Sequence, residues 1–317
     1  METIFQFRFQ FRSAPPGIRT NGVNALKTAI VTDTNSGLSM EQAEELGVHL
    51  IPMPFFIGGD TCLEGQDLTH ALFFEKMRQG AQVSTSQPSP HEITTLWESL
   101  LETHDRVMHF PMSAGLSGSC EVAKAMAQEY GGRVLVVDDR RISVTLEMSI
   151  RNAVALLGQG KTPEEVRDIL EGERREAVVY LAVNTLEYLR RSGRVTAAAS
   201  AMAAVLHIKP VLIIQEGKLD AYRKVRGMVQ AKKTLIEALR HDLSTRFKGM
   251  KMRVFSGYSG GDPALGTSWQ KEVQAAFPEW DVGLISLPLS ICCHTGEGAL
   301  GVACPTGSTP RRPRCPR

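Results

Sequence analysis

Three segments rich in Ser, Thr and Gly have the residue types that bind a small anion. They are residues 83–90 (VSTSQPSP), 112–119 (MSAGLSGS) and 294–301 (HTGEGALG). Each is expected where a strand gives way to a helix, so that hydroxyl groups and free N–H groups can face a ligand at the sheet edge. None has the acid–base pairing of a catalytic site, and His294 is their only ionisable candidate. Together they predict binding of a carboxylate-like anion without bond formation. Each segment alone is also explained by helix capping.

A fourth segment offers a different chemistry. Residues 257–261 (GYSGG) fit the pattern G-x-S-x-G, which places a nucleophilic serine between a strand and a helix in hydrolases. Asp281 and His294 follow in the hydrolase chain order of Ser, Asp and His. A glycine-rich turn before a helix explains the same residues. A serine hydrolase using Ser259, Asp281 and His294 is therefore kept as the alternative function.

Alternating strand and helix patterns must position these segments. Strands are expected at residues 28–32, 48–57, 106–111, 133–137, 178–183, 211–214, 218–222, 252–256 and 282–287. Helical patterns fall between most of them, including residues 185–191, 196–206, 228–243 and 263–276. Such alternation predicts an α/β protein with a largely parallel, layered sheet. A glycine break near residue 160 divides it into an N-terminal domain (27–160) and a C-terminal domain (161–304).

Composition excludes several classes of protein. A chain of 317 residues with 43% hydrophobic residues suits two domains with substantial cores. A net charge of +2 argues against a general nucleic-acid binder. No segment predicts a membrane span, a signal peptide, a metal site or a cofactor site, and the cysteines form no C-x-x-C pair, so we expect a cytoplasmic protein with reduced thiols. Residues 1–26 and 305–317 lack core-forming patterns and are expected to be disordered.

Seven short segments in a fixed order resemble the DegV family of bacterial fatty-acid-binding proteins. The similarity extends through most of residues 28–303. The segments are VTDTNSGL (31–38), STSQPS (84–89), SAGLSGS (113–119), LEYLRRSGRV (186–195), IKP with GKL (208–210, 217–219), KVR (224–226) and HTG (294–296).

This resemblance implies a two-domain fold, with a three-layer α/β/α N-terminal domain and a two-layer α/β C-terminal domain. It also implies a long-chain fatty acid whose carboxylate is held by Thr85, by a serine of the second segment and near His294. The family's second serine is Ala114 here, so Ser113 or the backbone around Ala114 must replace it. The expected ligand-binding residues are Thr85, Ser86, Ser113, Ala114, His294 and Thr295.

The resemblance further implies a partner. Family members can present their fatty acid to a separate kinase of the dihydroxyacetone-kinase type, which makes acyl phosphate from ATP. Contact with a membrane would then be peripheral and transient, for lipid exchange.

Five cations in two short segments are candidates for docking to this kinase: Arg190, Arg191, Arg194, Lys224 and Arg226. A solvated face explains them equally well. A structural or regulatory module without a ligand is a third possibility.

Overall fold

The structure is a computed structural model that describes residues 26–194 and 208–307. The helix expected at residues 196–206 lies outside the described residues. So do residues 1–25 and 308–317, which make up most of the two expected terminal extensions.

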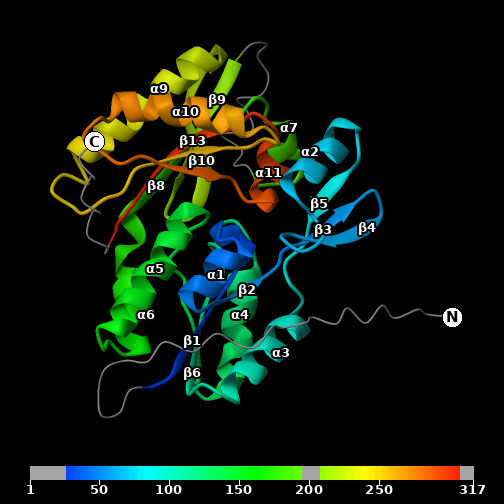
Figure 1. Cartoon of the computed structure of the whole chain (residues 1–317), viewed down its shortest axis with the longest axis vertical. Helices are drawn as coiled ribbons and strands as arrows, with labels where there is room; N and C mark the ends of the chain where they lie inside the picture. Colours follow the sequence, from blue (N-terminus) through cyan, green and yellow to red (C-terminus); the bar gives the residue numbers. More distant parts are fainter. Residues whose placement is uncertain (1–25, 195–207, 308–317) are drawn as a thin grey trace.

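The first half of the chain builds a parallel four-stranded sheet in the order β2–β1–β6–β7. Its strands are β1 (Thr28–Asp33), β2 (Val48–Ile51), β6 (Arg106–Phe110) and β7 (Val134–Val136). One face packs on α1 (Met40–Leu46), α5 (Val144–Gly158) and α6 (Pro163–Gly172), and the other on α3 (Pro90–Leu101) and α4 (Ser119–Ala127). Alternate residues of β1 point to opposite faces of the sheet, and helices cover both faces, so this strand is buried throughout. The expected three-layer α/β/α arrangement is confirmed (Figure 1).

The second half builds a six-stranded sheet in the order β10–β9–β8–β13–β11–β12. The strands are β8 (Ala177–Ala182), β9 (Ile208–Gln215), β10 (Lys218–Arg226), β11 (Phe255–Tyr258), β12 (Gly283–Ser286) and β13 (Leu300–Pro305). Only β11 and β12 pair in parallel, so the expectation of a largely parallel sheet is wrong here. The tight turn at Gly217 makes β9 and β10 a hairpin, and β13 enters antiparallel between β8 and β11.

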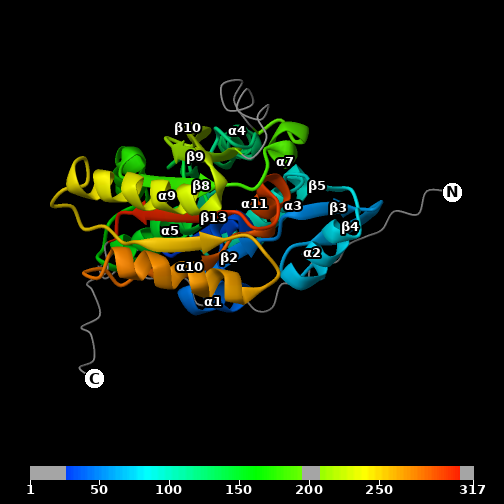
Figure 2. The same ribbon diagram turned by 90° about the horizontal axis from the view of Figure 1, so that it is seen from above.

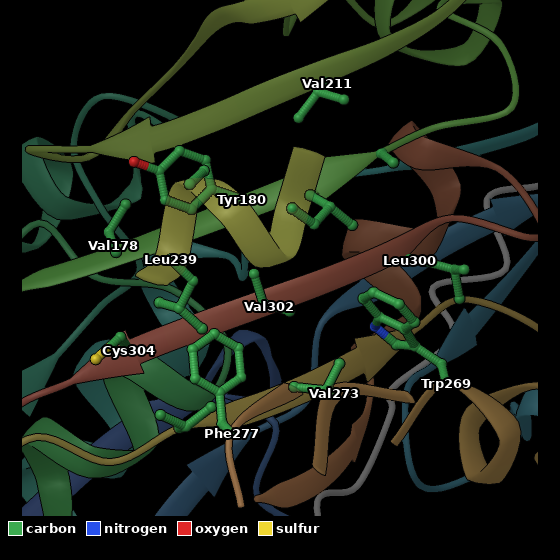
Figure 3. Close-up of a cluster of buried hydrophobic side chains, with 14 of the residues drawn as sticks. Val178, Tyr180, Val211, Leu239, Trp269, Val273, Phe277, Leu300, Val302 and Cys304 are labelled. Carbon is green, nitrogen blue, oxygen red and sulfur yellow. The ribbon is translucent and has the colours of Figure 1, made fainter. Parts of the chain in front are cut away.

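Two long helices cover one face of this sheet, α9 (Gly227–Ser244) and α10 (Pro263–Ala276) (Figure 2). Figure 3 shows the core between the sheet and these two helices, where Tyr180 and Val302 of the central strands meet Leu239 and Trp269 of the helices. Trp269 is fully buried, and its indole N–H donates to the carbonyl of Gly301 at 2.8 Å. This two-layer packing confirms the fold expected for the C-terminal part.

An arm of antiparallel strands connects the two sheets. It consists of β3 (Pro54–Ile57), β4 (Asp60–Leu63) and β5 (Val83–Thr85) with α2 (His70–Arg78). We expected one strand over residues 48–57, but the chain breaks at Pro52 and Met53 into β2 and β3, which belong to different sheets. Proline has no N–H for a strand ladder. The arm's Phe55, Phe73 and Phe74 share one core with residues 181–189 and with α11 (Leu289–Thr295).

The chain crosses between the sheets later than expected. The predicted boundary at residue 160 falls between α5 and α6, which pack on the same sheet, and the crossing comes at β8, after η3 (Glu173–Arg175). The glycine break there is a turn between two helices, capped by Thr162. The predicted end of the packed chain at residue 304 is also too early. Pro305 still pairs with Ala177, and Thr306 forms a bridge with Met252.

Three short elements complete the described chain. They are η1 (Thr34–Ser36), η2 (Gln128–Tyr130) and α7 (Glu187–Arg191). No helix of the described residues is both long enough and apolar enough to cross a membrane.

Candidate functional site

A cavity of about 420 Å³ lies where the arm, the six-stranded sheet and the four-stranded sheet with its helices meet. Its polar lining comes from segments far apart in the sequence: Asn35, Thr85, Ser86, Gln87, Ser117, Arg194, Ser290, His294 and Thr295. Its apolar lining includes Met53, Met112, Leu116, Ile142, Leu181, Leu189, Ile214, Leu219 and Ile291. The volume falls within the range of small-molecule sites. All three polar segments singled out in the sequence contribute to this cavity.

Thr85 and His294 form the polar centre of the cavity. Thr85 ends β5, and its Oγ1 lies 3.3 Å from Nε2 of His294, which α11 carries. Burial, aided by the charge of Arg194, lowers the pKa of His294 to about 4. The imidazole is therefore neutral at physiological pH, and its Nδ1 has no hydrogen-bond partner among the described residues. A neutral imidazole donates through one nitrogen and accepts through the other.

An apolar extension continues from this cavity along the six-stranded sheet. A smaller cavity of about 30 Å³ shares Ile142, Leu181, Ile214 and Ile291 with the main one. Its other walls are largely aliphatic side chains of β8, β12 and β13. The site therefore has one polar region and one apolar direction, which suits an amphipathic ligand with a single polar head.

Ser113 does not reach the cavity, contrary to our expectation. Its hydroxyl donates to the carbonyl of Gly217 at 3.0 Å and is buried there. A Cβ on Gly217 would lie 2.0 Å from that hydroxyl oxygen, and φ is +76°, so only glycine fits this turn. Ala114 does not line this cavity either, but it lines an adjoining pocket that shares Leu116, Ser117 and Arg194 with it. Ser117 of the same loop lines the cavity instead.

A second cavity of about 850 Å³ adjoins the first. The two share Thr85, Arg194 and His294, so the Thr85–His294 pair stands between them. Arg191 and Ser192 line the second cavity together with the glycine turns of the arm.

The structure separates the five cations that were predicted to dock a partner. Arg191 and Arg194 reach the second cavity, and Arg190 is exposed on α7 beside them. Lys224 and Arg226 are exposed on the edge strand β10 and line neither cavity.

The geometry does not support the alternative hydrolase site. The hydroxyl of Ser259 is fully buried and donates to the carbonyl of Gly296 at 2.6 Å. His294 instead faces Thr85, and Asp281 is exposed before β12. Ser259 therefore ties the end of β11 to the turn after α11, which is a structural role.

One cluster of metal-ligand residues occurs in the described chain, at Cys120, Glu121 and Asp138. The ammonium of Lys124 lies 2.9 Å from Glu121 and 3.0 Å from Asp138. A protein cation thus already neutralises these carboxylates, and the cluster does not need a metal ion.

Sequence reasoning missed four polar lining residues. Gln87 and Ser117 lie inside the predicted loops, so they were within reach of the argument. Asn35 lies in the opening segment and Ser290 one helical turn before His294, and neither position carries a distinctive signal. Arg194 was assigned to a partner surface, yet it also lines the ligand cavity.

Comparison with known proteins agrees with this architecture. The family described as "Uncharacterised protein, DegV family" matches residues 27–306. A DegV domain-containing protein of Deinococcus radiodurans is 32% identical over 279 residues, which cover 88% of this chain and 98% of the relative.

Two solved structures extend the similarity to three dimensions. A Thermus thermophilus DegV family protein, described with its fatty acid binding, has a TM-score of 0.79 at 33% identity, covering 88% of this chain and 99% of that one. DegV of Bacillus subtilis, described as a fatty acid binding protein, has a TM-score of 0.78 at 26% identity, covering 89% and 99%. With the family match over nearly all of the described residues, these similarities show that the chain belongs to the DegV family.

Proposed function

We propose that this protein binds a long-chain fatty acid, with the carboxylate at Thr85 and His294 and the acyl chain along the apolar wall. The observation that carries this proposal is the distribution of side chains in the site. A hydroxyl–imidazole pair lies at one place, and aliphatic side chains line the cavity that leads away from it. The Thermus and Bacillus relatives are both described as binding fatty acid, which supports the same ligand class.

The hydrogen bonds at the polar centre favour a carboxylate. In the tautomer protonated at Nε2, His294 donates to Thr85 and leaves the threonine hydroxyl free to donate to the ligand. The guanidinium of Arg194 lines the same cavity and supplies positive charge. A hydrogen bond to a charged carboxylate contributes more than a neutral one. Ser86 and Ser117 are proposed as further donors, and Thr295, whose hydroxyl donates to Ile291, as a wall residue.

The protein is further proposed to present this carboxylate to a separate fatty-acid kinase of the dihydroxyacetone-kinase type. The second cavity supports this, because it shares Thr85 and His294 with the first cavity, shares no residue with the apolar extension, and is lined by Arg191 and Arg194. A carboxylate oxygen would attack the γ-phosphorus of ATP held by the kinase, the bond to the β-phosphate oxygen would break, and ADP would leave. This chain supplies no catalytic residue in that scheme. Fatty-acid exchange would involve transient contact with a membrane surface.

Charge reversal of Arg190 and Arg191 tests the presentation step. Exposed charges at a docking surface mainly set association rates and their salt dependence. The double variant to Glu is therefore expected to bind palmitate normally and to form acyl phosphate several-fold more slowly with a cognate kinase at low salt.

The matched control reverses Lys248 and Lys251, two exposed lysines that line neither cavity. Equal rates for the Arg190/Arg191 variant, this control and the parent protein at both low and high salt would show that the two arginines are only a solvated face.

A further inference from the structure

The helix that carries His294 lacks a cap of its own. The first N–H groups of any α-helix need acceptors from outside the helix. Before α11 the cap position is Pro288, which makes no side-chain cap. Glu64 performs this function from 225 residues away: its Oε1 accepts from the N–H of Leu289 at 2.5 Å, and its carboxylate also accepts from the N–H of Ser290. A carboxylate at this end of a helix is favoured by the helix dipole.

Glu64 is itself held by Thr34, which directly follows β1 of the four-stranded sheet. Its Oε2 accepts from the hydroxyl of Thr34 at 2.7 Å, and that same oxygen of Thr34 accepts from the N–H of Met53 at 3.1 Å. The side chain is buried, 7% exposed. One carboxylate thus joins the end of β1, the arm that leads to Thr85 and the start of α11.

The face of α11 below this contact is the cavity wall. Ser290, Ile291, His294 and Thr295 all line the cavity, as expected for residues spaced by one helical turn. A shift of the first turn of α11 therefore moves His294 relative to Thr85, which the arm holds separately.

We propose that Glu64 is a positioning residue for the carboxylate site: its ionised side chain accepts from the first N–H groups of α11, so that His294 faces Thr85, and its protonation weakens these hydrogen bonds and thereby ligand binding. This inference rests on the proposed fatty-acid function. It assigns to that site a control by pH that acts through a residue outside the cavity.

The surroundings of Glu64 place its titration in the physiological range. Burial raises the pKa of Glu64 to about 7, and the nearby Asp33 adds to the increase. Burial likewise raises the pKa of Asp33 to about 6. On α11 the Cys292 thiol is the titratable neighbour, and on α2 His70 Nε2 lies 3.0 Å from the carbonyl of Leu287. Neither carboxylate forms an ion pair with a Lys or Arg of the described chain. His294 itself titrates well below this window.

Palmitate binding measured from pH 6 to pH 8 tests the proposal with Glu64→Gln. The parent protein is expected to bind about fivefold more weakly at pH 6 than at pH 8. Glu64→Gln should bind weakly throughout, with little change across the range. Glu64→Asp, which keeps the charge, should retain a pH slope. Glu45→Gln on the exposed face of α1 is the matched control and should behave like the parent.

Thr34→Val provides a second route if Glu64→Gln does not fold. The hydrogen bond from Thr34 lowers the pKa of Glu64. Its loss should therefore raise this pKa and move the midpoint of the binding curve to higher pH. Weakened binding with the parent's pH slope retained in Glu64→Gln would show a merely structural role and overturn the proposal. So would an unchanged midpoint in Thr34→Val. If the parent protein does not bind palmitate at all, the proposed function fails instead.

Discussion

Thr85 is the residue on which the proposed carboxylate site depends most directly. Thr85→Ala removes a hydroxyl that can donate to a charged group, a contribution of about 1.5–3 kcal/mol. Palmitate affinity is therefore expected to fall roughly tenfold to hundredfold, as measured by equilibrium binding. Thr85→Ser keeps the hydroxyl and should retain most of the affinity. Unchanged affinity in a folded Thr85→Ala protein would remove Thr85 from the site.

Ser113 and Ser117 are predicted to have separable roles. Ser113→Ala leaves the buried carbonyl of Gly217 without its donor, so the free energy of unfolding should fall by about 1–3 kcal/mol while palmitate affinity stays close to the parent's. Ser117→Ala should lower palmitate affinity with a smaller effect on stability, because Ser117 lines the cavity. Denaturant titrations paired with binding curves measure both quantities. A larger affinity loss in Ser113→Ala than in Ser117→Ala would contradict the assignment.

Glu64 should also leave a signature in the pH dependence of stability. Its pKa is raised from 4.5 to about 7, so between these values the folded protein holds a proton that the unfolded chain releases. The contribution of Glu64 to the free energy of unfolding therefore falls as pH rises through this window, by on the order of 3 kcal/mol, and is constant above it. Glu64→Gln cannot titrate. The stability of the parent relative to this variant should thus decrease between pH 5 and pH 7.5 in urea titrations, and parallel curves would refute the raised pKa.

At the scale of elements, the sequence predicts what is local and misses what depends on distant contacts. The residues 83–90 loop and His294, which line the cavity, could be singled out because each motif is contiguous and lies at a helix boundary. Ser113 was misassigned because its hydroxyl is directed by Gly217, 104 residues away. The arm was missed because only Pro52 and Met53 separate β2 from β3, and the partner strand β5 is too short to show alternation.

The end of β13 provides a test at the same scale. Beyond Cys304, the carbonyl of Pro305 accepts from Arg253 at 3.0 Å, and the N–H of Gly307 donates to Lys251 at 2.9 Å. A chain ending at Cys304 loses these contacts, each contributing about 1 kcal/mol. We expect it to melt several degrees below a chain ending at Gly307. Identical melting temperatures would show that these residues only lie alongside the sheet.

At the scale of the whole molecule, the main cavity belongs to no single domain. Residues of the four-stranded part, the arm and the six-stranded sheet each supply part of its wall. The sequence predicted two domains with a boundary in a glycine-rich turn, because local composition does not reveal which sheet a helix covers. The order of the strands in the second sheet was likewise hidden, since β13 joins β8 and β11 from the far end of the chain.

The most direct test of the account is native mass spectrometry of the full-length protein after mild purification, followed by lipid extraction. Fatty-acid binding predicts a bound mass that matches a long-chain fatty acid at up to one molecule per chain, and its loss in Thr85→Ala. Protein that carries no fatty acid and takes up none when mixed with palmitate would contradict the central claim.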